Sequence, residues 1–359
     1  MHLGKYKIMR LIAAITICMM LGLPTAGSAY VVRQDDSNLA RETGCPLYIW
    51  RDPAVHQPGA IIIAVHGSAQ EGAVMDGLAR VLVPQGMAVV APDVRGNGRW
   101  QRMKTSSEMA NMQLSDSCTD VSRILVILNK DYPGTDIFCL GESIGAGVVL
   151  KAVSENPRSV RGVILISAGV RPHMHNPLNM GTPFIKSMAM LVEPTDLKDY
   201  ISRYCSEDPR VVHEMLNDPL GKNRQSGLDL IGTFAFLRQE PQFAAAMPNN
   251  IPVLAIQGME DQIVEPSSVN DLLNALRTPE KHLVMVPGCG HVIVGTSFLK
   301  PQVVSCIEGW IQQHRSPTEP LPTNINASGA TDPNDSDRGL LNPADYSQSV
   351  IQDNAHRVH

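Results

Sequence analysis

Apolar and polar residues follow one another along the chain in two recurring patterns. Residues 60–67 and 87–93 are short, almost continuous apolar runs of the kind that form strands buried on both faces of a sheet. Between them, Val74, Leu78 and Leu82 recur at helical spacing, as in a helix with one buried face. Strands that alternate with helices predict βαβ units, and therefore an α/β fold in which helices cover both faces of a mostly parallel sheet.

The alternation continues beyond these runs, with one long interruption. Further strands are predicted at residues 136–142, 160–169, 251–258 and 282–288, and helices at residues 72–83, 106–130 and 144–156. Residues 170–250 are polar, helix-prone and repeatedly broken by proline, and a structureless loop of that length is unusual inside a compact domain. We therefore expect a helical cap at residues 170–250, inserted into a core formed by residues 30–169 and 251–315 and covering the carboxyl edge of its sheet.

Residues 1–29 have the order of a secretory signal peptide. Lys5, Lys7 and Arg10 precede an apolar run, and small residues follow it up to Ala29. The run has about 13 residues, whereas crossing a bilayer takes about 20. We expect cleavage close to Ala29, a mature chain without a stable membrane span, and a secreted or periplasmic protein. An uncleaved anchor is the alternative.

The other end of the chain has a different composition. Residues 316–359 are rich in Pro, Asn, Asp and Ser, so they cannot bury enough apolar surface to offset the entropy of ordering, and we expect a disordered tail. Of the seven cysteines, Cys18 lies in the signal peptide. The even number that remains permits disulfides in an exported protein, with the pairing left open. Cys139 lies within a predicted strand and is expected to be a buried free thiol.

Composition and charge narrow the classes of partner. Apolar residues make up 43% of the chain and charged residues 18%, as in globular proteins. The net charge is −5 and no long basic run is present, which argues against nucleic-acid binding. No motif of a metal or nucleotide site appears either. We expect a small-molecule partner and no metal or cofactor, and the oligomeric state stays open.

The sequence Gly-Glu-Ser-Ile-Gly at residues 141–145 places a hydroxyl between a predicted strand and a predicted helix. This is the pattern of a nucleophile elbow, in which a serine occupies a strained turn between strand and helix. An ordinary glycine turn is the alternative, because the short pattern also occurs by chance. A serine hydroxyl is a weak nucleophile at neutral pH, so Ser143 needs a histidine base that a carboxylate holds in place.

Asp261 and His291 follow later predicted strands in the order that such an acid and base require. Asp261 lies in the loop after one strand and His291 in the loop after the next. The carboxyl ends of parallel strands are also where ligands bind in open α/β sheets. Glu260 and Glu265 are rival acids, but the spacing after the strand favours Asp261. The sequence thus predicts a catalytic triad of Ser143, His291 and Asp261.

Backbone amides are expected to stabilise the negative oxygen that forms when a carbonyl is attacked. One donor is the amide of the residue after the nucleophile, here Ile144, and the other comes from the loop after an earlier strand. His66 and Gly67 open such a loop, in which Ser68 or Ala69 can present its amide.

Several of these segments resemble one family. Residues 65–100, 141–147, 208–223, 251–266 and 286–294 are similar to the α/β-hydrolases of the monoacylglycerol lipase and lysophospholipase group, also grouped with the serine aminopeptidases (S33). The resemblance implies that Ser143, Asp261 and His291 are the triad and that Ser68 and Ile144 supply the oxyanion donors. The chain departs from the group in having Asn97 and Trp100 where His and Ser are usual. It also lacks the Gly-Glu-His continuation after Gly67, so its head-group preference is left open.

Three functions remain open. The favoured one is a serine hydrolase that cleaves short-to-medium acyl esters, with monoacylglycerols and lysophospholipids as candidate substrates. A serine aminopeptidase or amidase would use the same chemistry but needs acidic residues in the pocket for a free amine, for which Glu193, Glu207 and Glu214 are available. The third is a non-catalytic binding protein on a hydrolase fold, although such proteins typically lose a triad residue.

Overall fold

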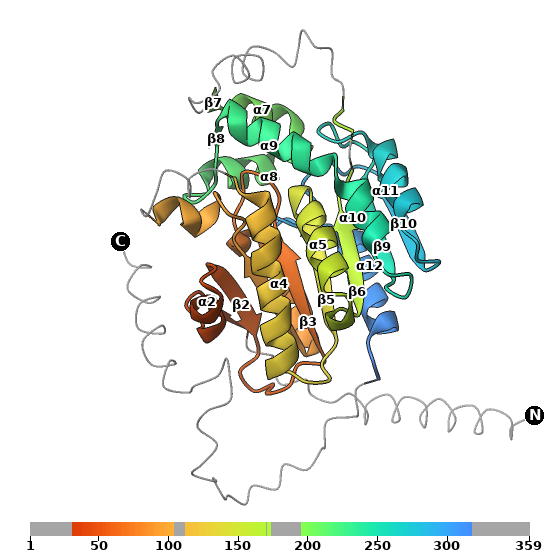
Figure 1. Ribbon diagram of the computed structural model, residues 1–359. Coiled ribbons are helices and arrows are strands. Elements are labelled where there is room, and N and C mark those ends of the chain that lie inside the picture. Colours follow the sequence, from red (N-terminus) through yellow and green to blue (C-terminus); the bar gives the residue numbers. More distant parts are fainter. Residues whose placement is uncertain (1–30, 104–111, 170, 174–194, 318–359) are drawn as a thin grey trace, which may run out of the picture.

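The computed structural model describes residues 31–103, 112–169, 171–173 and 195–317 (Figure 1). The predicted signal peptide at residues 1–29 lies outside the described residues, as do residues 318–359 of the predicted tail. Both stay predictions. None of the described helices is long and apolar enough to cross a membrane.

Eight strands form one sheet in the order β1-β2-β4-β3-β5-β6-β9-β10. They are β1 (Val32–Gln34), β2 (Leu47–Arg51), β3 (Ala60–Val65), β4 (Met87–Pro92), β5 (Ile137–Glu142), β6 (Gly162–Ile166), β9 (Val253–Gly258) and β10 (Lys281–Val286). The neighbouring strands β4, β3, β5, β6, β9 and β10 pair in parallel, whereas β2 pairs antiparallel with both β1 and β4. This confirms the predicted mostly parallel sheet of an α/β-hydrolase fold. The short antiparallel strands β1 and β2 were not predicted.

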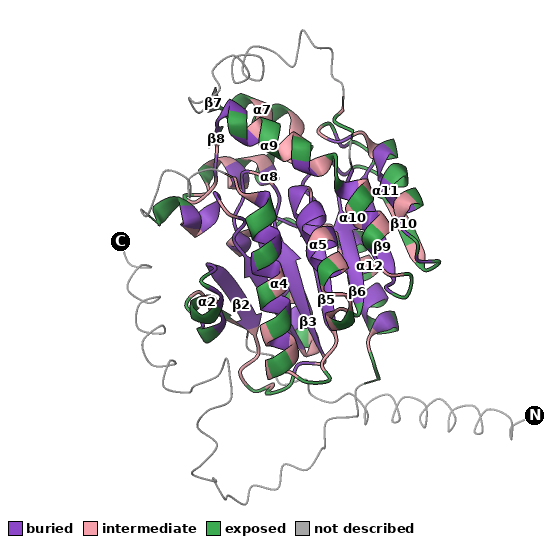
Figure 2. Ribbon diagram, in the orientation of Figure 1, coloured by how far each residue is buried: buried purple, intermediate pink, exposed green. Residues whose placement is uncertain are grey.

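Helices cover both faces of the sheet. The helices of the core are α2 (Asn38–Thr43), α3 (Asp76–Leu82), α4 (Leu114–Asp131), α5 (Ile144–Glu155), α11 (Val269–Ala275) and α12 (Pro301–His314). Successive strand residues point to opposite faces, so Ile61 and Ile63 pack in the same core as α4 and α5, while Ile62 and Ala64 pack with α3 and α12. Figure 2 shows the central strands buried along their length. This double coverage explains why the strands are continuous apolar runs in the sequence.

The described residues between β6 and β9 form mainly helices. They are β7 (Thr195–Asp196), α7 (Lys198–Tyr204), α8 (Pro209–Asn217), β8 (Arg224–Gln225), α9 (Gly227–Leu237) and α10 (Glu240–Ala246), with β7 and β8 paired antiparallel. Figure 1 shows α7, α8 and α9 beyond the carboxyl ends of the strands. By contrast, α10 packs beside α5 and α11. The predicted cap segment thus supplies helices that cover the carboxyl edge of the sheet and one helix, α10, that packs in the core layer. Its predicted boundaries stay a prediction, and residues 174–194 lie outside the described residues.

The cysteines in the described part of the chain are all free thiols. They are Cys45, Cys118, Cys139, Cys205, Cys289 and Cys306. Cys139 is fully buried in β5, where it packs as a small apolar side chain. The even number of cysteines therefore does not correspond to a disulfide framework within the described residues.

Two glycines allow the turn between β5 and α5 to pack tightly. A Cβ on Gly141 would collide with the carbonyl oxygen of Gly145, and a Cβ on Gly145 would collide with the carbonyl oxygen of Val65 in β3. The turn that carries Ser143 therefore lies directly against the neighbouring strand, at a distance that only glycine allows.

We predict that Gly145→Ala lowers the free energy of unfolding by about 1–3 kcal/mol, because backbone atoms must shift to make room for the methyl group. Gly232→Ala is the matched control, since a Cβ there meets no atom within 4 Å. In the middle of α9 it should stabilise the protein by up to about 1 kcal/mol. Urea denaturation of the two variants tests this. Equal effects would contradict the close approach of the turn to β3.

Glu240 is an unusual acid in the layer between α10 and α5. It is fully buried, and neither carboxyl oxygen has a hydrogen-bond partner among the described residues. Burial raises the pKa of this carboxyl well above its ordinary value of 4.5. Above pH 4.5 the unfolded chain releases this proton while the folded protein keeps it. The carboxyl therefore costs stability, and the cost grows as the pH rises towards the pKa of the folded state.

We predict that Glu240→Gln raises the melting temperature relative to the wild type more at about pH 8 than at about pH 4, because an amide has no proton to release. Differential scanning calorimetry at the two pH values measures this. The same difference at both would show that the folded protein does not hold Glu240 protonated.

Candidate active site

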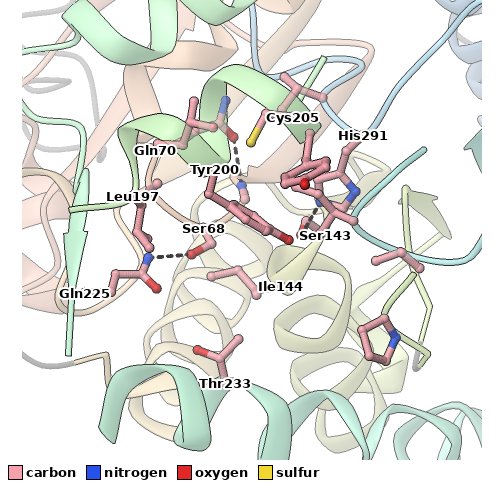
Figure 3. A pocket seen from close by; sticks show the side chains of 18 of the residues that line it. Ser68, Gln70, Ser143, Ile144, Leu197, Tyr200, Cys205, Gln225, Thr233 and His291 are labelled. Carbon is pink, nitrogen blue, oxygen red and sulfur yellow. Dashed lines mark hydrogen bonds between the residues drawn. The ribbon is translucent and has the colours of Figure 1, made fainter. Parts of the chain in front are cut away.

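Three loops at the carboxyl edge of the sheet bring the predicted triad residues together. Ser143 lies between β5 and α5, Asp261 follows β9, and His291 follows β10. The backbone of Ser143 has a φ of 56°, the strained conformation expected of a nucleophile elbow. The turn therefore presents its side chain beyond the end of the strand, beside His291 (Figure 3).

A continuous chain of hydrogen bonds joins the three side chains. Nδ1 of His291 lies 2.8 Å from Oδ2 of Asp261, and Nε2 of His291 lies 2.8 Å from Oγ of Ser143. An ionised carboxylate only accepts hydrogen bonds, so Nδ1 carries the proton and Nε2 is free to accept the serine hydroxyl. This is the tautomer that a general base requires.

The surroundings fix both the acid and the base. Asp261 accepts the amides of Ile263 at 2.8 Å and Val264 at 2.9 Å, and the side chain of Gln257 at 2.9 Å. The hydroxyl of Ser167, which follows β6, donates to the carbonyl of His291 at 2.6 Å. Both the carboxylate and the histidine backbone are therefore held by groups outside the predicted triad.

Burial and charge oppose each other in the pKa values of this pair. Burial lowers the pKa of His291, but the charge and hydrogen bond of Asp261 and the charge of Glu142 outweigh it, so the pKa is raised. Burial raises the pKa of Asp261, but the charge and hydrogen bond of His291 and the amides of Ile263 and Val264 outweigh it, so the pKa is lowered. The pair is arranged to hold a carboxylate beside an imidazole that gains a proton readily.

The rival acids lie elsewhere. Glu260 is exposed, and its carboxylate accepts the amide of Cys289 at 3.0 Å. Glu265 is 44% exposed and lies 3.7 Å from Arg171. Neither is hydrogen-bonded to His291.

The predicted oxyanion donors lie beside Ser143. Ser68 and Ile144 both line the same cavity as Ser143. As the first residue of α5, Ile144 has an amide with no acceptor inside the helix. A Cβ added to Gly67 would lie 3.4 Å from the Cβ of Ser143, so the loop after β3 passes directly over the elbow. Both residues therefore lie close to Ser143, and the role of their amides as donors stays a prediction.

The cap segment holds this loop in place. Ala69 has a φ of 63°, and its carbonyl accepts the amide of Lys222 at 3.0 Å. The buried side chain of Gln225 donates to the hydroxyl of Ser68 at 2.8 Å, a contact visible in Figure 3. Sequence reasoning missed Gln225, because a single glutamine in a polar segment carries no motif.

The three loops and the cap segment enclose a cavity of about 300 Å³. Its walls combine the loops with α7 and α9, and Figure 3 shows Tyr200 and Leu197 on the side opposite Thr233. The apolar lining residues from α9 and from the loop after β9 are Leu230, Phe234, Leu237, Ile263 and Val264. The cavity is therefore mainly apolar, with polar groups from the triad, from the loop after β3 and from the cap segment, where Asp199 and Arg203 also line it.

Residues 56–296, well over half of the chain, match the family model of the serine aminopeptidases, S33. The chain belongs to this α/β-hydrolase family. Among its relatives, human monoglyceride lipase is 25% identical over 264 residues, which cover 72% of this chain and 84% of the relative. The monoacylglycerol lipase of Mycolicibacterium smegmatis is 24% identical over 262 residues, 72% of this chain and 89% of the relative.

Solved structures agree in fold. A soluble variant of the monoglyceride lipase of Saccharomyces cerevisiae, in complex with a substrate analog, superposes with a TM-score of 0.66 at 15% identity, covering 82% of this chain and all of the other. A monoacylglycerol lipase from Paleococcus ferrophilus gives a TM-score of 0.57 at 19% identity, covering 79% of this chain and 99% of the other. At these identities the likeness shows the fold alone.

We predict that Asp261→Asn slows the reaction of Ser143 with a fluorophosphonate by about a hundredfold or more, because an amide no longer holds His291 in the required tautomer. Glu260→Gln should leave the rate close to that of the wild type, since this side chain does not contact the imidazole. Labelling time courses at fixed pH measure both rates. A large loss in Glu260→Gln together with a small loss in Asp261→Asn would reassign the acid.

Proposed function

We propose that the protein is a serine hydrolase that cleaves carboxylic esters through an acyl-enzyme on Ser143. The observation that carries this proposal is the continuous hydrogen-bonded chain of Ser143, His291 and Asp261 at one end of an apolar cavity. Relatives named as monoglyceride and monoacylglycerol lipases support ester hydrolysis as the reaction.

In the first half-reaction, the hydroxyl of Ser143 attacks the ester carbonyl while Nε2 of His291 takes its proton. The imidazolium then forms between the serine and Asp261, whose negative charge stabilises it. The amides of Ser68 and Ile144 stabilise the carbonyl oxygen as it becomes negative. His291 returns the proton to the leaving alcohol, which departs and leaves an ester on Ser143. Water, activated by the same histidine, then releases the acid and restores the hydroxyl.

The positions of two cap glutamates favour esters over peptides with a free amine. Glu207 accepts the amide of Gly290 at 2.5 Å, and Glu214 accepts the hydroxyls of Thr296 and Ser297, both at 2.5 Å. Neither glutamate lines the cavity. Of the three glutamates available to an aminopeptidase, Glu193 lies outside the described residues, and these two already bind the loop of His291.

The lining of the cavity supports an acyl chain as the group bound. Each methylene moved from water to an apolar environment gains about 0.8 kcal/mol, so three or four can change the preference by more than tenfold. A cavity of about 300 Å³ is at the small end of ligand pockets, which suits short-to-medium chains. We therefore propose short-to-medium acyl esters, with monoacylglycerols and lysophospholipids as the candidate natural classes. From residues 1–29 alone we also propose that the enzyme is secreted or periplasmic.

A panel of chromogenic substrates tests the proposal. We predict that kcat/KM rises about tenfold or more from acetyl to butyryl and octanoyl esters, because the longer chains bury more methylenes. Alanine and proline anilides should react slowly or not at all. Ser143→Ala is the control and should lose about a millionfold in kcat.

Two other results would point to the competing functions. An enzyme that prefers the anilides would be an aminopeptidase, and Asp199, an exposed acid on α7 that lines the cavity, would then be the residue to test for amine binding. A folded protein that neither turns over any substrate nor reacts with a fluorophosphonate would be a binding protein.

A further inference from the structure

Glu142 lies immediately before Ser143 and is the last residue of β5. Its side chain is 1% exposed, and its two oxygens accept three consecutive backbone amides. Oε1 accepts from Ile293 at 2.7 Å and from Val294 at 2.8 Å, and Oε2 accepts from Gly295 at 2.9 Å. These amides belong to the loop between β10 and α12 and begin two residues after His291.

The contacts suit an ionised carboxylate, which only accepts hydrogen bonds. Oε1 accepts two amides and Oε2 accepts one. Burial raises the pKa of Glu142 above its ordinary value, and the three amides and the charge of His291 offset this only in part. Gly295 lies so close that a Cβ there would be 2.6 Å from Oε2. The carboxylate of Glu142 is therefore in close contact with residues 293–295 of the loop.

The loop has no regular secondary structure, so contacts with side chains and neighbouring segments fix its shape. Residues 287–300 contain neither helix nor strand, yet their buried amides need acceptors. Glu142 supplies the acceptor for three of them, and its backbone is continuous with that of the nucleophile. We propose that Glu142 is a positioning residue, whose carboxylate ties the loop of His291 to the nucleophile elbow and so sets the distance between Oγ of Ser143 and Nε2 of His291.

The charge of Glu142 has a second, measurable consequence. It is one of the two carboxylates that act to raise the pKa of His291, the other being Asp261. Two further titratable side chains, Cys205 and Tyr200, lie near these carboxylates. Burial raises the pKa of Cys205 to about 12, and burial also raises the pKa of Tyr200, so both stay neutral wherever the imidazole titrates.

Three variants separate positioning from mere structural support. Glu142→Gln keeps the shape of the side chain but removes its charge and one acceptor. Glu142→Asp keeps the charge but is one methylene too short to reach all three amides. Glu260→Gln is the matched control, because Glu260 accepts a single amide, that of Cys289, on the other side of His291 in the same loop.

The inference rests on the proposed function, so each variant is followed in two ways. Ester turnover gives kcat, KM and the pH profile of kcat/KM, and fluorophosphonate labelling gives the reactivity of Ser143 whatever the natural substrate. We expect Glu142→Gln to lower kcat about ten- to a hundredfold with little change in KM, because a small displacement of the base slows the chemical step. In both readouts its acid limb should move to lower pH, since the imidazole loses a neighbouring negative charge.

The other two variants should behave differently. Glu142→Asp should lose kcat but keep the acid limb of the wild type, and Glu260→Gln should change neither. A wild-type kcat and acid limb in folded Glu142→Gln would overturn the proposal, as would an equal loss in Glu260→Gln. If Glu142→Gln does not fold, Glu142→Asp decides, and a wild-type kcat there overturns it. A wild-type protein that is labelled but hydrolyses no ester would instead overturn the proposed substrate class and leave the Glu142 comparison valid.

Discussion

The close approach of the β5–α5 turn to β3 is the constraint on which the site depends. It holds Ser143 at a positive φ, which costs about 1–3 kcal/mol for a non-glycine residue and persists only where the surroundings enforce it. This turn gives three consecutive residues three different surroundings. Glu142 binds the loop after His291, Ser143 binds His291 itself, and Ile144 lines the cavity next to the serine. One turn therefore determines the positions of Ser143, the loop of His291 and one wall of the cavity.

Around this turn, acidic side chains accept hydrogen bonds from backbone amides that helices or strands would pair elsewhere. The loop of His291 has no strand partner, and several of its amides are bound by carboxylates. The pairs are Cys289 with Glu260, Gly290 with Glu207, Ile293, Val294 and Gly295 with Glu142, and Ser297 with Glu214. Glu207 and Glu214 belong to the cap segment, which also binds the loop after β3 through the hydrogen bond from Gln225 to Ser68. The cap segment is thus part of the scaffold of both loops as well as the roof of the cavity.

Much of the fold and the position of the site could be predicted from the sequence, for physical reasons. Strands covered on both faces must be apolar throughout, so β3, β4, β5, β6 and β9 are visible as runs, and residues that follow parallel strands share one edge of the sheet. The edge strand β1 was missed because its three residues leave no such run, and β2 was missed because its apolar run, residues 47–50, is too short to stand out. The role of Glu142 could not be predicted, because it depends on hydrogen bonds across 151–153 positions of the chain. Likewise, the sequence could not distinguish Glu207 and Glu214 from amine-binding or surface acids.

The distribution of charge separates the two sides of the site. Asp261 and Glu142 are both buried, and the negative charges of both favour the protonated imidazole of His291. The cavity is mainly apolar, and in the proposed mechanism the amides of Ser68 and Ile144 meet the negative oxygen. Because buried carboxylates would repel the oxyanion if they faced it, their contacts with loop amides have a second effect. Each amide that binds Glu142 directs its partial positive charge at the carboxylate and so offsets part of the negative charge. In the proposed mechanism, the hydrogen bonds that shape the loop therefore also reduce the negative charge that the oxyanion on the substrate would meet beside Ser143.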